Sequence, residues 1–138
     1  MATITKFEQI EAWKSARLLT KQVYQHSGQG RFAKDFGFRD QICRAAVSVM
    51  SNIAEGFESQ TQALFINYLG QARASAGEVR SQLYVAMDLD YISGESFNQM
   101  LKQAEKTSGQ IYKFISYLQS IPNTRRISDN QNFYELPD

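Results

Sequence analysis

The sequence contains few of the residue types on which many classes of functional site depend. It has one cysteine, Cys43, one histidine, His26, and two prolines. A single cysteine excludes an internal disulfide and any metal site built from several cysteines. The scarcity of proline favours long uninterrupted elements. His26 lies at the end of a predicted helix, where a cation suits the negative helix terminus, and we interpret it as a capping residue.

Long apolar runs and a strong net charge are also absent. No stretch approaches 18 apolar residues and no signal-like segment opens the chain, so we expect neither a membrane span nor secretion. The expected location is the cytoplasm. The net charge is +1, but residues 1–44 carry eight Lys and Arg against four Asp and Glu, whereas residues 45–138 carry seven against ten. This asymmetry predicts a local basic patch, unless folding spreads the charges evenly.

Catalytic signatures are missing as well. The sequence has no phosphate-binding glycine loop, no HExxH and no G-x-S-x-G. We therefore predict no catalytic residues, no metal site and no cofactor, and we interpret the chain as not being an enzyme.

Helical periodicity is the main pattern that the sequence does contain. Apolar residues recur at spacings of three and four, which predicts four helices over about residues 8–27, 37–56, 60–89 and 93–120. No alternating pattern predicts a strand. Short connections between amphipathic helices favour an all-α, antiparallel up-and-down four-helix bundle over residues 1–121. Residues 122–138 form a polar C-terminal tail whose composition is typical of disorder, with Phe133 and Tyr134 available to dock on a neighbour.

Several residues predict how the helices end and begin. Gly56 is placed to end the second helix in a left-handed conformation. Ser59 with Gln62 predicts a capping box for the third helix, and Ser93 predicts the cap of the fourth. The loop over residues 28–36 is expected to be anchored in the bundle by Phe32 and Phe36.

The second helix has an unusually wide apolar face. At about 100° per residue, its apolar side chains cover roughly 200°, which suggests enclosure on more than one side. Its polar arc, with a matching arc on the third helix, forms a candidate structural polar seam: Gln41, Arg44, Ser48, Asn52, Glu55, Gln71, Ser75, Glu78 and Gln82. Three interpretations are open, namely a solvated face, a buried seam within or between subunits, and a catalytic carboxylate pair. In a buried seam, Arg44 would pair with Glu55 or Glu78.

A stripe of small residues follows one side of the third helix: Gly70, Ala74, Gly77 and Ser81. Each glycine inside a helix costs about 1 kcal/mol relative to alanine. Two on one stripe suggest the close approach of another backbone, more plausibly between subunits than within one. An exposed face that tolerates glycine is the alternative.

Basic residues are spaced along one face of the first helix. Lys14, Arg17 and Lys21 form a stripe that continues across the next loop, so that the candidate nucleic-acid-binding set is Lys14, Arg17, Lys21, Arg31, Lys34 and Arg39. Such a stripe can follow phosphates. The alternative is an ordinary solvated helix face.

Several short motifs resemble those of a known family. They occur in the order Phe7…Trp13-Lys14-x-Ala16, Val23-Tyr24, Phe36-Gly37-Phe38-x-x-Gln41-Ile42-x-Arg44-Ala45, Ser48-x-x-x-Asn52-Ile53-Ala54-Glu55-Gly56, Tyr68-Leu69-x-x-Ala72-x-x-Ser75-x-x-Glu78 and Gln82-Leu83. The pattern is similar to that of small bacterial four-helix bundle proteins first noticed as open reading frames in intervening sequences of 23S rRNA genes. The chain departs from it at Ala33, where proline is usual, and at Asp35, where glutamate is usual.

The resemblance covers roughly residues 6–120 and implies a four-helix bundle that assembles as a homopentamer. It also implies a distant similarity to the accessory proteins of diversity-generating retroelements, which bind nucleic acid. Taken together, we expect a non-enzymatic oligomeric binding module that binds RNA or DNA through the basic stripe. The alternative is a protein-interaction scaffold that uses the bundle surface or the tail. Expected partners are further copies of the chain, RNA or DNA, or a protein, and not a membrane.

Overall fold

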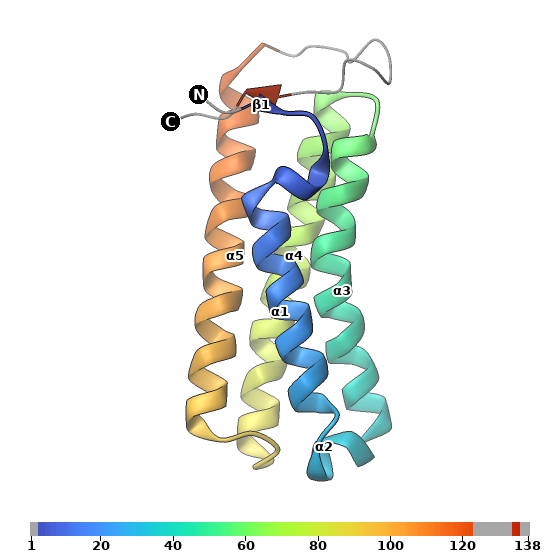
Figure 1. Ribbon diagram of the computed structural model, residues 1–138, viewed down its shortest axis with the longest axis vertical. Helices are drawn as coiled ribbons and strands as arrows, with labels where there is room; N and C mark the ends of the chain where they lie inside the picture. Colours follow the sequence, from blue (N-terminus) through green and yellow to red (C-terminus); the bar gives the residue numbers. More distant parts are fainter. Residues whose placement is uncertain (1–2, 123–133, 136–138) are drawn as a thin grey trace.

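The computed structural model describes residues 3–122 and 134–135. Four long helices dominate it (Figure 1): α1 (Glu11–Ser27), α3 (Phe36–Glu58), α4 (Gln62–Asp88) and α5 (Gly94–Ser120). Three short elements precede or connect them: strand β1 (Thr3–Ile4), the 3-10 helix η1 (Phe7–Gln9) and helix α2 (Gly30–Lys34). Strand β2 (Tyr134–Glu135) pairs antiparallel with β1, with Ile4 opposite Tyr134.

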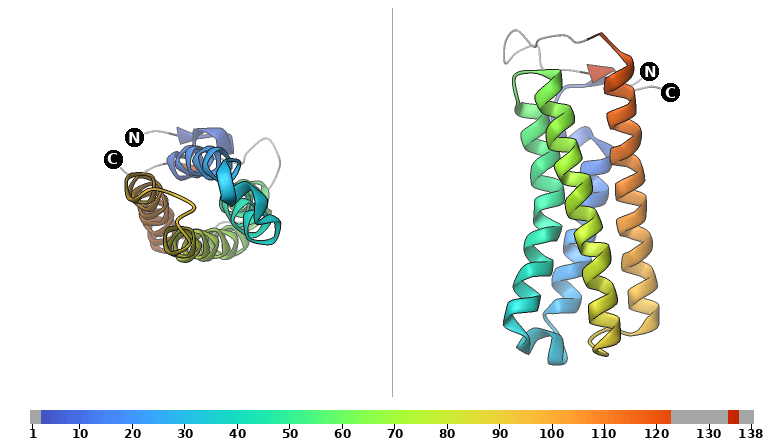
Figure 2. Two further views of the ribbon diagram at one scale, coloured as in Figure 1. Left: turned by 90° about the horizontal axis from the view of Figure 1, so that it is seen from below. Right: turned by 180° about the vertical axis from the view of Figure 1, so that it is seen from behind.

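The long helices lie side by side around a common axis. Each contacts two others, so that α1, α3, α4 and α5 form a closed ring of neighbours. Figure 2 shows this four-cornered arrangement end-on. In Figure 1 the chain runs down α1, up α3, down α4 and up α5, with α2 at the lower end.

The predicted all-α class and the four long helices are confirmed, and their observed bounds differ from the predicted ones by a few residues. The four short elements β1, η1, α2 and β2 were missed because they carry too few residues for periodicity to register. Helix α2 lies in the segment predicted as a loop. Phe32 is buried there as expected, whereas the prediction that Phe36 anchors this segment is wrong, because its side chain is 75% exposed.

The tail prediction is tested only at Tyr134 and Glu135, which form β2 with the chain's own N-terminal strand. Phe133 and the rest of the predicted tail, apart from Pro122, lie outside the described residues.

The core consists of two clusters along the bundle axis. One, towards β1 and η1, contains large side chains such as Phe57, Phe65 and Phe114. The other, towards α2, contains Phe32 and Ile42. Buried alanines from the long helices belong to the same two clusters: Ala12, Ala16, Ala45, Ala46, Ala72, Ala76 and Ala104. Small side chains allow the helices to approach closely, while the aromatic rings fill the wider spaces.

Helix caps are provided by short polar side chains, as helix physics requires. Asp35 accepts a hydrogen bond from the backbone N–H of Phe38 at the start of α3, and Ser93 caps α5 as predicted. The predicted cap of α4 is wrong. Thr61 performs that function by accepting from Leu64 N–H, and Ser59 instead donates to the carbonyl oxygen of Gly56.

Gly56 does not end α3 in a left-handed conformation, which corrects a further prediction. The helix continues to Glu58, and Gly30 is the glycine with a positive φ among the described residues. A Cβ at Gly56 would lie 2.7 Å from Cδ1 of Phe65 and 2.9 Å from Cβ of Tyr68. This glycine therefore allows α4 to pack against α3.

No helix in the described part of the chain combines the length and apolar character needed to cross a membrane.

Replacing Gly56 with alanine should lower the free energy of unfolding by about 1–3 kcal/mol, because the added methyl group overpacks the α3–α4 contact. Chemical denaturation at fixed protein concentration measures this change. Gly109→Ala is the matched control, since a Cβ there meets nothing within 4 Å. The control should stabilise the protein by up to about 1 kcal/mol through the gain in helix propensity. Equal effects of the two substitutions would contradict this account of Gly56.

Candidate functional site

The centre of the predicted polar seam forms between α3 and α4. The hydroxyl oxygens of Ser48 and Ser75 lie 2.9 Å apart. Asn52 donates from Nδ2 to the carbonyl oxygen of Ser48 at 2.9 Å and to its hydroxyl at 3.0 Å. All three side chains are half-buried. This network links one turn of α3 to α4 within the subunit.

The charged members of the predicted seam lie outside this network. Arg44 is 81% exposed, and its Nε lies 3.1 Å from Oδ2 of Asp40, one turn earlier on α3. Within the subunit, Arg44 therefore pairs with Asp40 and not with Glu55 or Glu78. An Asp one turn before an Arg on the same helix is the nearest available partner, and it needs no contact between helices.

Most of the remaining polar residues of the two arcs face outward. Gln41, Glu55 and Gln71 are exposed. Gln82 donates from Nε2 to Oε1 of Glu78 at 3.3 Å on the surface of α4, while its own Oε1 is buried with no hydrogen-bond partner among the described residues.

The small-residue stripe lies on the outer face of α4. Gly70, Ala74, Gly77 and Ser81 are all exposed. A Cβ at Gly70 or Gly77 would meet nothing within 4 Å. Packing within the subunit therefore does not require small residues at these positions.

The predicted basic set is divided between two environments. On α1, Lys14 pairs with Glu11 at 3.2 Å, and the guanidinium of Arg17 lies 5.7 Å from the ring centroid of Trp13. Arg17 and Lys21 are exposed, and no carboxylate of a described residue lies within 4.0 Å of either.

Arg31 makes contacts within the subunit at the lower end of the bundle. It donates from a terminal nitrogen to the carbonyl oxygen of Leu89 at 2.9 Å, and its guanidinium lies 5.6 Å from the ring centroid of Tyr91. Arg31 thereby connects α2 to the turn between α4 and α5. Lys34 is exposed, and Arg39 is half-buried beside a pocket described below.

Tyr91, in the turn between α4 and α5, also contacts α2 and the residue that caps α3. Its position follows from the end of α4, where Asp90 takes a left-handed conformation with φ 58° and Tyr91 N–H donates to the carbonyl oxygen of Ala86 at 2.9 Å. Its ring stacks on Phe32, with centroids 5.3 Å apart, and its hydroxyl donates to Oδ2 of Asp35 at 2.8 Å. This hydrogen bond is the main cause that raises the pKa of Tyr91 above its ordinary value of 10.0, and burial and the charge of Asp35 add to it.

A pocket of about 520 Å³ opens where α1 ends and α3 begins. It is lined by Tyr24 from α1 and by five residues of α3, namely Phe36, Gly37, Arg39, Asp40 and Cys43. We call it the Tyr24–Phe36 pocket. Its volume lies in the range typical of small-ligand sites. Cys43 is buried, and its Sγ lies 3.3 Å from the hydroxyl oxygen of Ser27.

Sequence reasoning missed this pocket and a second basic stripe. Lys102, Lys106 and Lys113 are exposed on the outer face of α5. Their spacing of four and seven residues was a readable signal for this stripe. The pocket had no comparable signal, because its walls come from α1 and α3, which are separated in sequence by α2.

Among the described residues, no group of three or more His, Cys, Asp and Glu side chains is placed to hold a metal ion.

Replacing Tyr91 with phenylalanine should lower the stability of the protein at neutral pH and change how stability depends on pH. Because the folded state raises the pKa of Tyr91, the stabilising contribution of its hydroxyl is present below pH 10.0 and is lost as the pH rises through the raised pKa. The stability difference between wild type and Tyr91→Phe should therefore be constant from neutral pH to about 10 and shrink above it. Urea denaturation across this range measures the difference.

Tyr112→Phe is the control for this experiment, because the hydroxyl of Tyr112 makes no hydrogen bond to a described residue. It should change stability less than Tyr91→Phe at neutral pH. A wild-type advantage over Tyr91→Phe that grows above pH 10 would contradict the assignment.

The fold and sequence have known relatives. In a crystal structure of a protein with unknown function from the S23 ribosomal protein family of Bacteroides thetaiotaomicron VPI-5482, the similar region covers 76% of this chain and 95% of that chain. The TM-score is 0.70 and the sequence identity 23%, so this likeness concerns the fold. No match is found among curated proteins.

The sequence itself matches the family model of the 23S rRNA-intervening sequence protein over residues 8–113, which spans all of α1 to α4 and most of α5. The predicted resemblance is thus confirmed, and the chain belongs to the 23S rRNA-intervening sequence protein family.

Proposed function

We propose that this protein is a non-enzymatic, oligomeric binding module that binds RNA or DNA through the exposed cations of α1. The observation that carries the proposal is the state of Arg17 and Lys21. Both are exposed one turn apart on α1, and neither has a carboxylate of a described residue within 4.0 Å. Their charge is available to phosphates, whereas that of Lys14 is partly offset by Glu11.

The position of Arg17 favours contact with a nucleic-acid backbone. Its guanidinium lies over the half-buried Trp13, which limits the conformations of the side chain without occupying its N–H donors. Each phosphate neutralised by such a cation releases counterions, so binding should depend steeply on salt.

Assembly into an oligomer would place several copies of a weak binding site on one particle. The overall charge of +1 predicts weak binding by one subunit, whereas several stripes on one oligomer gain avidity when a single strand reaches more than one of them. We expect a homopentamer, as the family resemblance implies. The outer face of α4 suits the contact between subunits, because Gly70 and Gly77 leave open space there and Val85, one turn after Ser81, is an exposed apolar residue.

The proposed location is the cytoplasm. A single buried thiol, Cys43, is compatible with a reducing compartment, and RNA and DNA are available there.

Reversing the charge of Arg17 and Lys21 to glutamate should weaken RNA or DNA binding by roughly tenfold or more and reduce its salt dependence. Fluorescence anisotropy with labelled oligonucleotides, repeated over a salt series, measures both. Wild type should bind in about the micromolar range at low salt. Lys102→Glu with Lys106→Glu on α5 makes the same charge change at the same spacing and should cost less affinity. Equal losses in the two double variants would rule out α1 as the binding element, and no binding by wild type at low salt would overturn the proposed function.

The assembly is tested by sedimentation equilibrium. Wild type should be a homo-oligomer at micromolar concentration, with a mass that fits a pentamer. Gly77→Arg should shift the distribution towards smaller species, because a long charged side chain would occupy the α4 face. Gly109→Arg, at an equally open position on α5, should leave it unchanged. A wild-type monomer would contradict the proposed oligomer.

A further inference from the structure

We propose that the Tyr24–Phe36 pocket binds an unpaired base of a single-stranded nucleic acid, so that the protein selects single strands over duplexes. This inference rests on the proposed function, since it specifies which form of nucleic acid the basic flank of α1 would hold.

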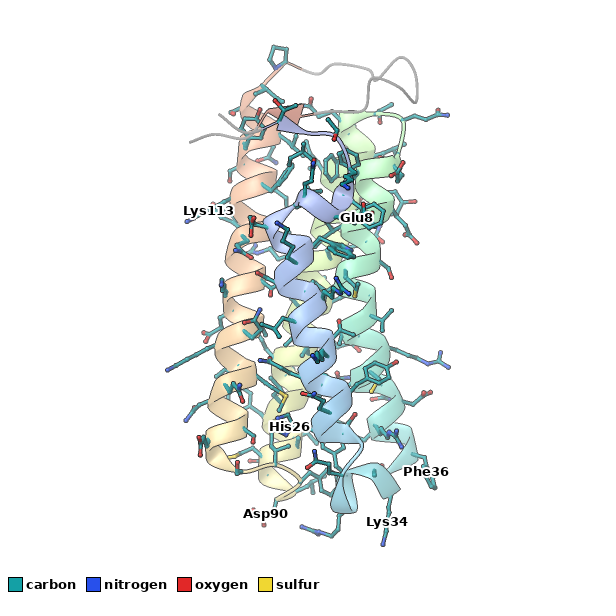
Figure 3. The ribbon with its side chains drawn as sticks, in the orientation of Figure 1. Glu8, His26, Lys34, Phe36, Asp90 and Lys113 are labelled. Carbon is teal, nitrogen blue, oxygen red and sulfur yellow. The ribbon has the colours of Figure 1, made fainter. Side chains whose placement is uncertain are left out.

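The walls of the pocket are aromatic rings that the fold leaves unused. Tyr24 is 50% exposed and Phe36 is 75% exposed. Figure 3 shows Phe36 projecting away from the lower end of the bundle. Neither ring contacts the ring of another described residue. Exposed rings of this kind offer stacking surfaces for bases, and such stacking tolerates any base sequence.

Gly37 also lines the pocket and adds no side chain to it. A Cβ at this position would meet nothing within 4 Å, so packing within the subunit does not require a glycine there. The buried Cys43 adds the surface of a small hydrophobic side chain to the lining. The pocket therefore suits a flat, uncharged ring.

The polar groups of the pocket distinguish a base from a phosphate. Asp40 lines it, and its carboxylate repels a phosphate group but accepts hydrogen bonds from the N–H groups of a base. Arg44, whose Nε lies 3.1 Å from Oδ2 of Asp40, offsets part of this charge from outside the lining. Arg39 supplies guanidinium donors for the carbonyl and ring nitrogen acceptors of a base.

Cations lie on both sides of this pocket, where they could contact the phosphates on either side of a bound base. Lys21 lies one helical turn before Tyr24 on α1, and both are exposed. Lys34, two residues before Phe36, projects from the lower end of the bundle (Figure 3). No carboxylate of a described residue lies within 4.0 Å of Lys21 or Lys34. The combination of exposed rings with flanking cations is the arrangement by which proteins hold single strands.

The decisive substitution is Gly37→Leu, which fills the pocket while every cation and both aromatic rings are retained. Its matched control is Gly109→Leu, which places the same side chain at an open position on α5 between Lys106 and Lys113. Phe36→Ala removes one wall and provides a second test. Because Phe36 is mostly exposed, this variant should fold normally.

The probes are labelled oligonucleotides of about 12 units: a thymidine single strand, a single strand of the same charge with abasic sites in place of bases, and a duplex. Wild type should bind the thymidine strand about tenfold more tightly than the abasic strand, the effect expected from roughly one base–aromatic stack. Gly37→Leu and Phe36→Ala should abolish this difference, and Gly109→Leu should keep it. Duplex binding should respond to charge reversal at Arg17 and Lys21 but not to Gly37→Leu.

The outcomes separate the two proposals. Equal binding of thymidine and abasic strands by wild type would overturn the base pocket and leave the proposed nucleic-acid binding intact. No binding of any probe would overturn both. If Gly37→Leu alters the sedimentation of the protein but not its preference for the thymidine strand, the pocket holds a side chain from a second copy, and the inference is wrong.

Discussion

Close packing of small side chains between the long helices is the constraint on which the rest of the structure depends. At the contact of α3 with α4, a Cβ on Gly56 would lie within 3 Å of two atoms of α4. Nearer the middle of the bundle, the hydroxyl groups of Ser48 and Ser75 meet at 2.9 Å. These two contacts specify which residues of α3 and α4 lie opposite each other. Aromatic rings such as Phe57 and Phe32 then fill the two ends of the core.

This packing also decides what remains on the surface. Because each long helix contacts two others, the inward faces of the bundle are used for folding and the outward faces carry side chains with few internal partners. On α1 these include Arg17 and Lys21, and where the chain turns into α3 they include Phe36. Arg31 differs from them, since its donation to the carbonyl oxygen of Leu89 joins α2 to the turn between α4 and α5 at the lower end of the bundle. The predicted nucleic-acid-binding cations therefore fall into two groups. Some make contacts that hold the subunit together, and others have a charge that is accessible to a partner.

Much of the fold could be predicted, because periodic burial over twenty or more residues leaves a strong pattern in the sequence. Local details were harder to predict. Gly56 looked like a helix terminus, since a glycine before a polar segment commonly is one. The structure shows instead that a glycine is needed there because α4 approaches closely. Phe36 looked like an anchor because large apolar residues are usually buried, yet it is exposed at the first position of α3. For Gly56 the deciding contact comes from another helix. For Phe36 no contact with the core buries the ring. The sequence of one helix shows neither outcome.

The sequence by itself determined the all-α class, the extent of the four long helices and the family, since these depend on local periodicity and on short motifs within single helices. Only the tertiary structure decided which polar residues meet. It joined Ser48 to Ser75, paired Arg44 with Asp40 rather than with Glu55 or Glu78, and brought Tyr24 and Phe36 to one pocket. The physical reason is that helical periodicity specifies which face of a helix is buried. The neighbour that buries it, and the outward residues that come together as a result, depend on how the helices pack against one another.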